Sequence, residues 1–177
     1  MKRHDRMQRV KSGGRNSLAS WTSVRSPARV LVNWLVTKFC KRLPSLRAKR
    51  WLLRKLGARI GKNVGFSESA DIDFFFPDLI EVGDNTVIGF QTLILTHEFL
   101  VGEFRKAPVK IGKNVLVGAR CIILPGVEIG DGATVSAMSL VNKDVPAGET
   151  WGGIPARKIR MPPIPRNQNT KSIIYDV

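Results

Sequence analysis

The sequence predicts an all-β solenoid, a parallel β-helix of about four coils with a helical segment before it and an extruded loop. The prediction rests first on apolar residues that recur every six positions in three blocks: Ile60, Phe66 and Ile72; Val82, Ile88 and Ile94; and Ile111, Val117, Ile123, Ile129, Val135 and Val141. A period of six suits neither an α-helix, at about 3.6 residues per turn, nor a lone strand, at about 2, but it suits coils built from short flat sides. With three sides to a coil, twelve such positions make about four coils, each covering the apolar interior of its neighbour.

Two further regularities support this architecture. A small or modest side chain stands four residues after each periodic position of the third block, at Val115, Cys121, Val127, Ala133, Ser139 and Val145. Glycine follows six periodic residues, at Gly61, Gly83, Gly89, Gly112, Gly118 and Gly130, where a bend would leave no room for a Cβ atom. A sandwich of ordinary strands is the alternative, but it would not hold one phase over six consecutive units.

The rest of the chain divides by composition. Residues 1–27 are rich in Lys, Arg, Ser and Gly and predict a basic flexible tail. Residues 28–58 predict a helical segment that breaks at Pro44, restarts from a Ser45 cap and ends at Gly57. Residues 59–150 form the predicted coil, with the extruded loop at 98–110, and residues 151–177 form a C-terminal tail. The apolar half of the first helix carries Val32, Leu35, Val36, Phe39, Cys40 and Leu43, and its polar half carries Asn33, Thr37, Lys38, Lys41 and Arg42.

Composition and charge exclude several classes of protein. The 177 residues are 43% hydrophobic and 24% charged, which is typical of one soluble globular domain. Residues 1–60 hold 17 Lys and Arg against the single acid Asp5, or +16, while residues 61–177 hold 12 against 13, or −1. Two cysteines give neither a disulfide framework nor a metal-ligand spacing, so we expect a cytoplasmic protein with no metal site. The longest stretch free of Asp, Glu, Lys and Arg has 13 residues, from Asn85 to His97, so we expect no membrane span. Dinucleotide-binding, Walker, serine-hydrolase and zinc-protease motifs are absent from the sequence.

Several strings of the second half carry a family resemblance. They are I-G-K-N-V-L-V-G-A from Ile111, I-L-P-G-V-E-I-G-D-G-A from Ile123, V-N-K-D-V-P from Val141 and G-G-I-P-A-R-K-I-R from Gly152. With them, residues 59–160 resemble the hexapeptide-repeat acyltransferases of the left-handed β-helix type, nearest to the maltose and galactoside O-acetyltransferase group. The resemblance implies acetyl-CoA as co-substrate, no permanently bound cofactor, and a homotrimer with a donor groove between neighbouring coils. Only the resemblance implies that the coil is left-handed, because a six-residue period does not indicate the handedness of a coil.

His97 is the expected catalytic base. The sequence holds only His4 and His97, and His97 opens the extruded loop. Acyl transfer from a thioester to an alcohol needs a base that works near neutral pH, as histidine does, and the family's base is a histidine at the start of such a loop. The alternative is a loop histidine that merely caps a strand. Glu98 and Glu103 are the nearby carboxylates for the second ring nitrogen, with Glu103 preferred, unless both are solvated loop charges.

The resemblance also places acceptor and donor contacts. Asp73 and Glu98 are candidates for orienting the acceptor hydroxyl, and the neighbouring triplet at 74–76 is expected to pack against the N-terminal helix. The donor groove would be lined by Gly118, Ala119, Ala137 and Ser139, with Arg157 and Lys158 near the phosphates of coenzyme A. Met138 stands where the family commonly has Gly, which predicts a narrower donor channel, and Ile154 stands where it commonly has Asn.

We therefore expect an O-acyltransferase that moves an acyl group, acetyl in the simplest case, from coenzyme A to a hydroxyl of a sugar or of an envelope glycan or lipid precursor. A non-catalytic trimeric β-helix serving as a scaffold or binding module is the alternative. A nucleic-acid partner is disfavoured, because the basic tail has no recognition motif. Residues 29–59, with ten Lys and Arg and no acid, are expected either to cap the coil or to meet an anionic surface at the inner face of the membrane.

Overall fold

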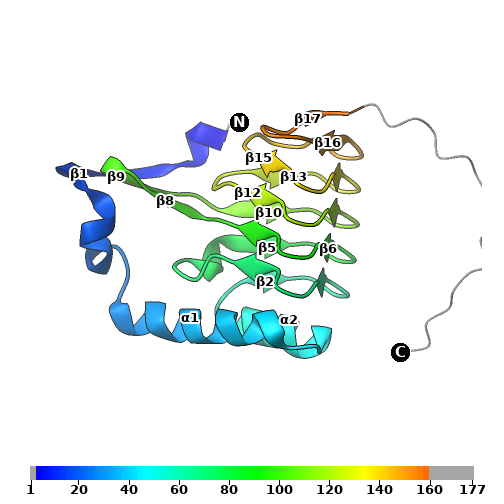
Figure 1. Cartoon of the computed structure of the whole chain (residues 1–177), viewed down its shortest axis with the longest axis horizontal. Helices are drawn as coiled ribbons and strands as arrows, with labels where there is room; N and C mark the ends of the chain where they lie inside the picture. Colours follow the sequence, from blue (N-terminus) through cyan, green and yellow to red (C-terminus); the bar gives the residue numbers. More distant parts are fainter. Residues whose placement is uncertain (1–2, 160–177) are drawn as a thin grey trace, which may run out of the picture.

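A stack of short strands makes up most of the molecule, and two helices lie across one end of the stack (Figure 1). The structure is a computed structural model that describes residues 3–159. The helices are α1 (Pro27–Arg42) and α2 (Leu46–Lys55). The hydroxyl of Ser45 accepts a hydrogen bond from the Ala48 amide at 3.3 Å and begins α2, and Gly57 ends the segment with a φ of +103°, a conformation that favours glycine.

The strands form three parallel sheets that the chain visits in rotation. Sheet B contains β2 (Arg59–Ile60), β5 (Ile80–Val82), β10 (Val109–Ile111) and β13 (Glu128–Ile129). Sheet C contains β3 (Gly65–Phe66), β6 (Val87–Ile88), β11 (Leu116–Val117), β14 (Thr134–Val135), β16 (Thr150–Gly152) and, antiparallel at its edge, β17 (Arg157–Lys158). Sheet D contains β4 (Asp71–Ile72), β7 (Leu93–Ile94), β12 (Ile122–Ile123) and β15 (Leu140–Val141). Each circuit through B, C and D, here called a rung, pairs in parallel with the next, and four complete rungs are followed by part of a fifth.

The core of the coil consists of the periodic residues. All twelve are buried, and none exposes more than 6% of its surface, because each is the last residue of its strand and points inward. The strand register stacks them in columns, as in the pairings of Val82 with Ile111 and of Ile111 with Ile129. Buried threonines tie the rungs together: Thr92 Oγ1 donates to the Gly118 carbonyl at 2.7 Å, so its hydroxyl keeps a partner inside the apolar interior.

The glycines of the period are explained by close stacking rather than by a bend. A Cβ atom on Gly118 would lie 2.4 Å from the Ala137 amide nitrogen of the next rung, and one on Gly89 would lie 2.5 Å from the Gly118 carbonyl carbon. The left-handed backbone conformation at the corners of the coil is taken by other residues, among them Asn85 and Asn114. Glycine is therefore required where one rung rests on the next.

The N-terminal region differs from the expected flexible tail. It forms the 3-10 helices η1 (Arg3–Arg6) and η2 (Ser17–Ser23) and, between them, strand β1 (Gln8–Asn16). The loop predicted at 98–110 is a hairpin of β8 (His97–Phe99) and β9 (Val101–Lys106), and β1 pairs antiparallel with β9 to complete sheet A. The low apolar content of the tail is offset by this pairing, because the exposed edge of β9 supplies backbone partners that an isolated segment lacks.

One other boundary and one helix face also differ from expectation. The predicted C-terminal tail begins too early, because β16 and β17 belong to sheet C; residues 160–177 lie outside the described residues. The segment between the first two blocks of periodic residues, from Ile72 to Val82, contains the 3-10 helix η3 (Pro77–Leu79). Helix α1 turns Asn33 and Thr37 toward the coil. Of its apolar half, Cys40 is buried and Val36 packs against the core, while Leu35 and Phe39 are exposed. Within residues 3–159, no helix has the length and apolar character needed to cross a bilayer.

Candidate active site

His97 lies at a corner of the coil where the hairpin leaves the second rung. Strand β7 of sheet D ends at Ile94, and three residues later the chain departs as β8 instead of continuing into sheet B. The His97 side chain is 13% exposed, and its Nδ1 lies 2.5 Å from Oδ2 of Asp73. No hydrogen bond joins Nε2 to any residue of the described part of the chain, so this nitrogen is the one available for proton transfer.

Asp73 is fixed from several directions and is buried, with 1% of its side chain exposed. Its Oδ2 also accepts from the amide and the hydroxyl of Thr96, each at 2.8 Å, and its Oδ1 accepts from the Phe75 amide at 2.8 Å. Burial alone would raise the pKa of Asp73, but the hydrogen bond and charge of His97 and the bonds from Thr96 outweigh it and hold that pKa below its usual value. The carboxylate therefore stays charged and orients the imidazole.

Aromatic rings enclose the imidazole. Ring centroids of four phenylalanines lie within about 6 Å of the His97 ring centroid: Phe75 at 4.7 Å, Phe99 at 4.9 Å, Phe76 at 5.8 Å and Phe104 at 6.1 Å. Two N-terminal elements complete the cluster, since Trp21 of η2 packs edge-on against Phe75 at 5.8 Å and Val30 of α1 joins the same buried group. These apolar walls exclude water and strengthen the bond between His97 and Asp73.

The carboxylates that the sequence favoured for His97 lie elsewhere. Glu103 forms an ion pair with Arg105, whose hydrogen bond lowers the pKa of Glu103. Glu98 pairs with Arg3 of η1 and approaches Arg105 at 3.9 Å. The residue beside the imidazole is instead Asp73, which in turn is too enclosed to orient an acceptor hydroxyl. The expected packing of the triplet at 74–76 against α1 is present, because Asn33 Nδ2 donates to the Phe74 carbonyl at 2.8 Å.

The residues expected in the donor groove gather at another corner of the coil. Gly118 and Ala119 follow β11, and Ala137 follows β14, so all three occupy the corner between sheets C and D in consecutive rungs. Ser139 does not face this corner: it is 2% exposed, and its hydroxyl donates to the Ser136 carbonyl at 2.6 Å and accepts from the Gly153 amide at 3.1 Å.

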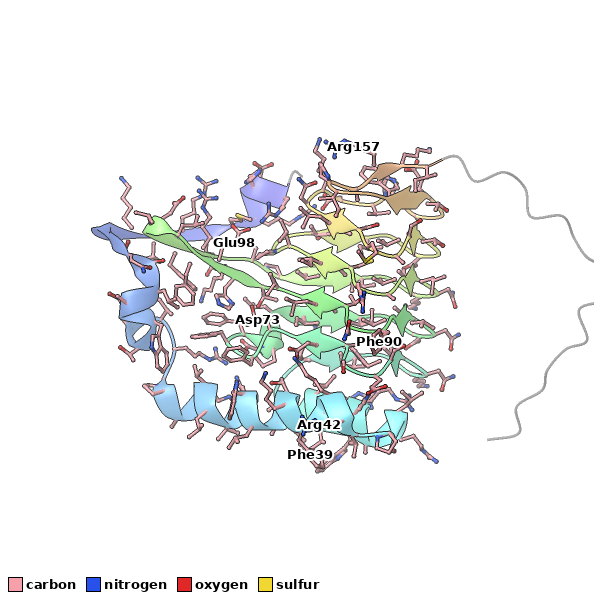
Figure 2. The ribbon with its side chains drawn as sticks, in the orientation of Figure 1. Phe39, Arg42, Asp73, Phe90, Glu98 and Arg157 are labelled. Carbon is pink, nitrogen blue, oxygen red and sulfur yellow. The ribbon has the colours of Figure 1, made fainter. Side chains whose placement is uncertain are left out.

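The remaining donor candidates lie on the surface. Arg157 and Lys158 are exposed on β17, at the end of the coil opposite α1 (Figure 2), and Lys158 Nζ lies 2.5 Å from Glu149 Oε1. Met138, the departure from the family pattern, is 58% exposed and has a φ of +60°. Its side chain therefore stands out from the corner that Gly118 and Ala137 occupy.

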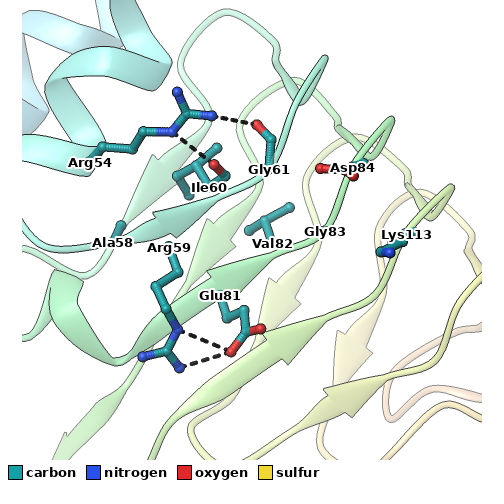
Figure 3. A pocket seen from close by; sticks show the side chains of 10 residues that line it. All are labelled: Arg54, Ala58, Arg59, Ile60, Gly61, Glu81, Val82, Gly83, Asp84 and Lys113. Carbon is teal, nitrogen blue, oxygen red and sulfur yellow. Dashed lines mark hydrogen bonds and ion pairs between the residues drawn. The ribbon is translucent and has the colours of Figure 1, made fainter.

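A separate groove of about 370 Å³ lies where α2 meets the first rungs (Figure 3). Its charged groups are largely occupied within the protein: the Arg54 guanidinium donates to the carbonyls of Ile60 and Gly61, each at 2.8 Å, and Arg59 pairs with Glu81 at 2.8 Å. None of its lining residues contacts His97. The groove joins the helices to the coil and lies apart from the base.

Comparisons with known proteins agree with this fold. Residues 108–140 match the family described as the hexapeptide repeat of succinyl-transferase. YvoF of Bacillus subtilis, provisionally named an acetyltransferase, is 46% identical over 132 residues, which cover 74% of this chain and 77% of that protein. Galactoside O-acetyltransferase of Escherichia coli is 40% identical over 88 residues, 46% of this chain and 43% of that protein. A solved galactoside acetyltransferase in complex with coenzyme A superposes with a TM-score of 0.57 at 28% identity, covering 76% of this chain and 80% of that one.

Proposed function

The chain belongs to the family of hexapeptide-repeat acetyltransferases, and on that premise we propose that it is an O-acetyltransferase with His97 as its general base. The acyl donor is acetyl-CoA, by analogy with the relative solved with coenzyme A. The acceptor is a hydroxyl of a sugar or of an envelope glycan or lipid precursor. The protein works in the cytoplasm, and its coil is a left-handed β-helix like those of the family.

One observation carries this proposal, the pair formed by His97 and Asp73 inside the aromatic cluster. A buried carboxylate at 2.5 Å fixes Nδ1 as the protonated nitrogen, which leaves Nε2 as an acceptor for a proton. Nε2 takes the proton of the acceptor hydroxyl while its oxygen attacks the thioester carbonyl. The tetrahedral intermediate then expels the thiolate of coenzyme A, which receives the proton from the imidazolium. Direct transfer of this kind needs no covalent enzyme intermediate.

The position of the donor residues favours a homotrimer. His97 lies at the corner between sheets D and B, whereas Gly118, Ala119 and Ala137 lie at the corner between sheets C and D. These two corners of one coil face different directions. A site that uses the base from one corner and the donor residues from the other is therefore completed by a neighbouring copy. Cyclic symmetry closes such contacts in a ring, and Arg157 and Lys158 would then lie where the phosphates of the donor emerge.

The proposal is tested by incubating the full chain with acetyl-CoA and a panel of hexoses, glycosides and lipid-linked sugars, with free thiol release and O-acetylated product both measured. Thiol release that depends on one acceptor class, with matching ester formation, supports the proposal and identifies the acceptor. Calorimetry with coenzyme A provides the second measurement. Absence of binding there, with no ester formed from any acceptor, would favour the non-catalytic scaffold instead.

A further inference from the structure

Most of the larger apolar residues of α1 face away from the coil, which is not expected of a helix that only caps the coil. The residues it buries are spaced at helical intervals, Val30, Asn33, Thr37 and Cys40, and two of these are polar. Asn33 is fully buried, and its amide bonds the Phe74 carbonyl, while the Thr37 hydroxyl bonds the Trp34 carbonyl at 3.0 Å. The inward face is therefore occupied by polar and medium-sized side chains rather than by the larger apolar side chains of the helix.

Those larger side chains face away from the coil. Leu31, Val32, Trp34, Leu35 and Phe39 of α1 are exposed, as are Leu46 and Trp51 of α2; these seven residues are here called the outer face. Phe39 exposes 61% of its surface, and Figure 2 shows it with Arg42 on the side of α1 that is turned away from the rungs. Helix α2 also buries a cation, Lys49, beside Leu53, and the Lys49 ammonium donates to the Phe66 carbonyl at 3.2 Å. An exposed apolar surface of this extent on a folded protein marks an interaction site.

The charged residues of the two helices are all of one sign. No Asp or Glu occurs between Asp5 and Glu68. Several of the basic residues in this segment are used inside the protein, such as Lys41 in its pair with Asp71. Four others, Lys38, Arg42, Arg47 and Lys55, are exposed and form no hydrogen bond or ion pair with any residue of the described chain. Lys38 and Lys55 lie over the rings of Trp34 and Trp51, at 6.0 Å and 5.6 Å, so cations border the apolar residues directly.

We propose that the outer face is a docking surface for an anionic lipid bilayer. Exposed leucines, tryptophans and a phenylalanine, bordered by cations, suit the boundary between acyl chains and negatively charged headgroups. A second copy of the chain fits less well, because a two-fold contact between two outer faces would bring together two surfaces that both carry these four cations. The helices lie across the end of the coil, so the whole surface can meet a flat bilayer without disturbing the rungs.

Docking of this kind would bring the base near the membrane. Val30 of α1 belongs to the aromatic cluster, and Phe75 of that cluster lies 4.7 Å from the His97 ring. Only one layer of side chains therefore separates α1 from the imidazole. This step rests on the proposed function: if His97 is the base, the acceptor is an amphiphile held in the bilayer, such as a lipid-linked sugar, rather than a free sugar.

Vesicle flotation with the full chain tests the docking surface without reference to activity. The protein is mixed with vesicles of phosphatidylcholine alone or with added phosphatidylglycerol, at low and high ionic strength. We expect it to float with the anionic vesicles at low ionic strength and to lose most of that binding when salt screens the charges. Protein that remains in the soluble fraction with anionic vesicles at low ionic strength would overturn the proposal.

Two variants with matched controls locate the surface. The double variant Leu35→Ser with Phe39→Ser should lower the vesicle partition coefficient at least about tenfold, while Val101→Ser, at an 85% exposed apolar residue of the hairpin, should leave it unchanged. Lys38→Gln with Arg42→Gln should lower it similarly, and Lys143→Gln, at an exposed lysine near the other end of the coil, should not. Thermal unfolding checks that each variant is folded.

Other outcomes of these variants would also overturn the proposal. Equal loss of binding in the controls would show that the outer face is not the docking surface. A sedimentation mass that falls in the Leu35→Ser and Phe39→Ser double variant, without any vesicle binding of the unaltered chain, would assign the face to a second copy. Flotation without any acetyl transfer would retain the docking surface and reject only the proposed function.

Discussion

Asp73 and His97 are 24 positions apart in sequence, and the coil brings Oδ2 of one to 2.5 Å from Nδ1 of the other. Each residue follows a strand of sheet D, and β4 and β7 pair in register, with Ile72 beside Ile94. The pair therefore depends on the stacking of the first two rungs, and also on the hairpin, because His97 is the first residue of β8. A rigid scaffold of this kind can hold a base and its orienting carboxylate without help from substrate.

Replacing His97 with Ala should lower kcat about 100- to 10,000-fold, which is the usual contribution of a positioned general base. The measurement is steady-state acetyl transfer with the acceptor identified in the panel, together with coenzyme A affinity by calorimetry. Affinity should change little, because the donor residues occupy another corner. His4→Ala, at an exposed histidine of η1, is the control. Loss of less than about tenfold in kcat with the fold intact would remove His97 as the base.

Asp73→Asn should lower kcat about 10- to 1,000-fold, because an amide in place of the carboxylate no longer fixes the protonated nitrogen of the imidazole. Coenzyme A affinity should remain within about twofold of that of the unaltered chain, since Asp73 has no part in the donor corner. Glu103→Gln, which alters the carboxylate that pairs with Arg105, should retain most of the activity. A larger loss in Glu103→Gln than in Asp73→Asn would reverse the assignment.

The stability difference between the unaltered chain and Asp73→Asn should depend on pH. The folded-state pKa of Asp73 lies below its usual value, so the charged carboxylate stabilises the folded state at neutral pH. That stabilisation is present above the pKa of Asp73 in the unfolded chain, about 3.9. It is lost as the pH falls through the lower pKa that Asp73 has in the folded state. Denaturant titrations between neutral pH and strongly acidic pH should show the two stabilities converging only at the acidic end. A difference that does not change with pH would contradict this.

Gly118→Ala should destabilise the fold by about 1–3 kcal/mol, because the new methyl group meets the backbone of the next rung, which cannot move without shifting the stack. Gly65→Ala is the matched control: a Cβ atom there has no heavy atom within 4 Å, and the backbone is not left-handed. Denaturant unfolding of both variants measures the difference. Equal stabilities would show that the rungs are spaced more loosely than the structure has them.

Met138→Gly should lower the KM for acetyl-CoA several-fold if the side chain narrows the donor channel. The change in stability should be small, because relief of the left-handed strain at +60°, about 1–2 kcal/mol, is offset in part by the added freedom of glycine in the unfolded chain. Ser69→Gly occupies the same corner in the first rung, with a φ of +57°, and should show the stability change without the change in KM. An unaltered KM in Met138→Gly would place the channel elsewhere.

The coil could be predicted in detail because every rung repeats the same physical requirement. A residue that points inward in a two-residue strand must be apolar, and a corner that rests on the next rung must lack a Cβ atom, so Ile111 and Gly118 each leave a periodic signal. The carboxylate partner of His97 gives a weaker signal in the sequence. Asp73 stands one residue after a periodic position, as Leu95 does, and this shared phase indicates proximity only once the rungs are stacked.

The N-terminal region could not be predicted in the same way. Strand β1 contains a single apolar residue, Val10, and owes its form to the edge of β9, which lies about 90 residues away in sequence. Hydrophobicity alone could not show which residues of α1 face the coil. At this end of the coil α1 packs against a polar backbone group, the Phe74 carbonyl. Asn33 donates a hydrogen bond to this carbonyl, which a leucine could not do.

The N-terminal segment connects the two ends of the coil. Helices α1 and α2 contact the first rung, while Arg6 of η1 donates to the Gly126 carbonyl at 2.7 Å and to Asp144 at 2.8 Å near the last one. In a linear array of repeats each unit is held only by its neighbours, and the terminal units can fray alone. Here the last rungs cannot open without releasing η1, and with it the edge that holds the His97 hairpin. The connection converts a stack of semi-independent layers into a single cooperative unit. The position of His97 therefore depends on rungs that do not contact it.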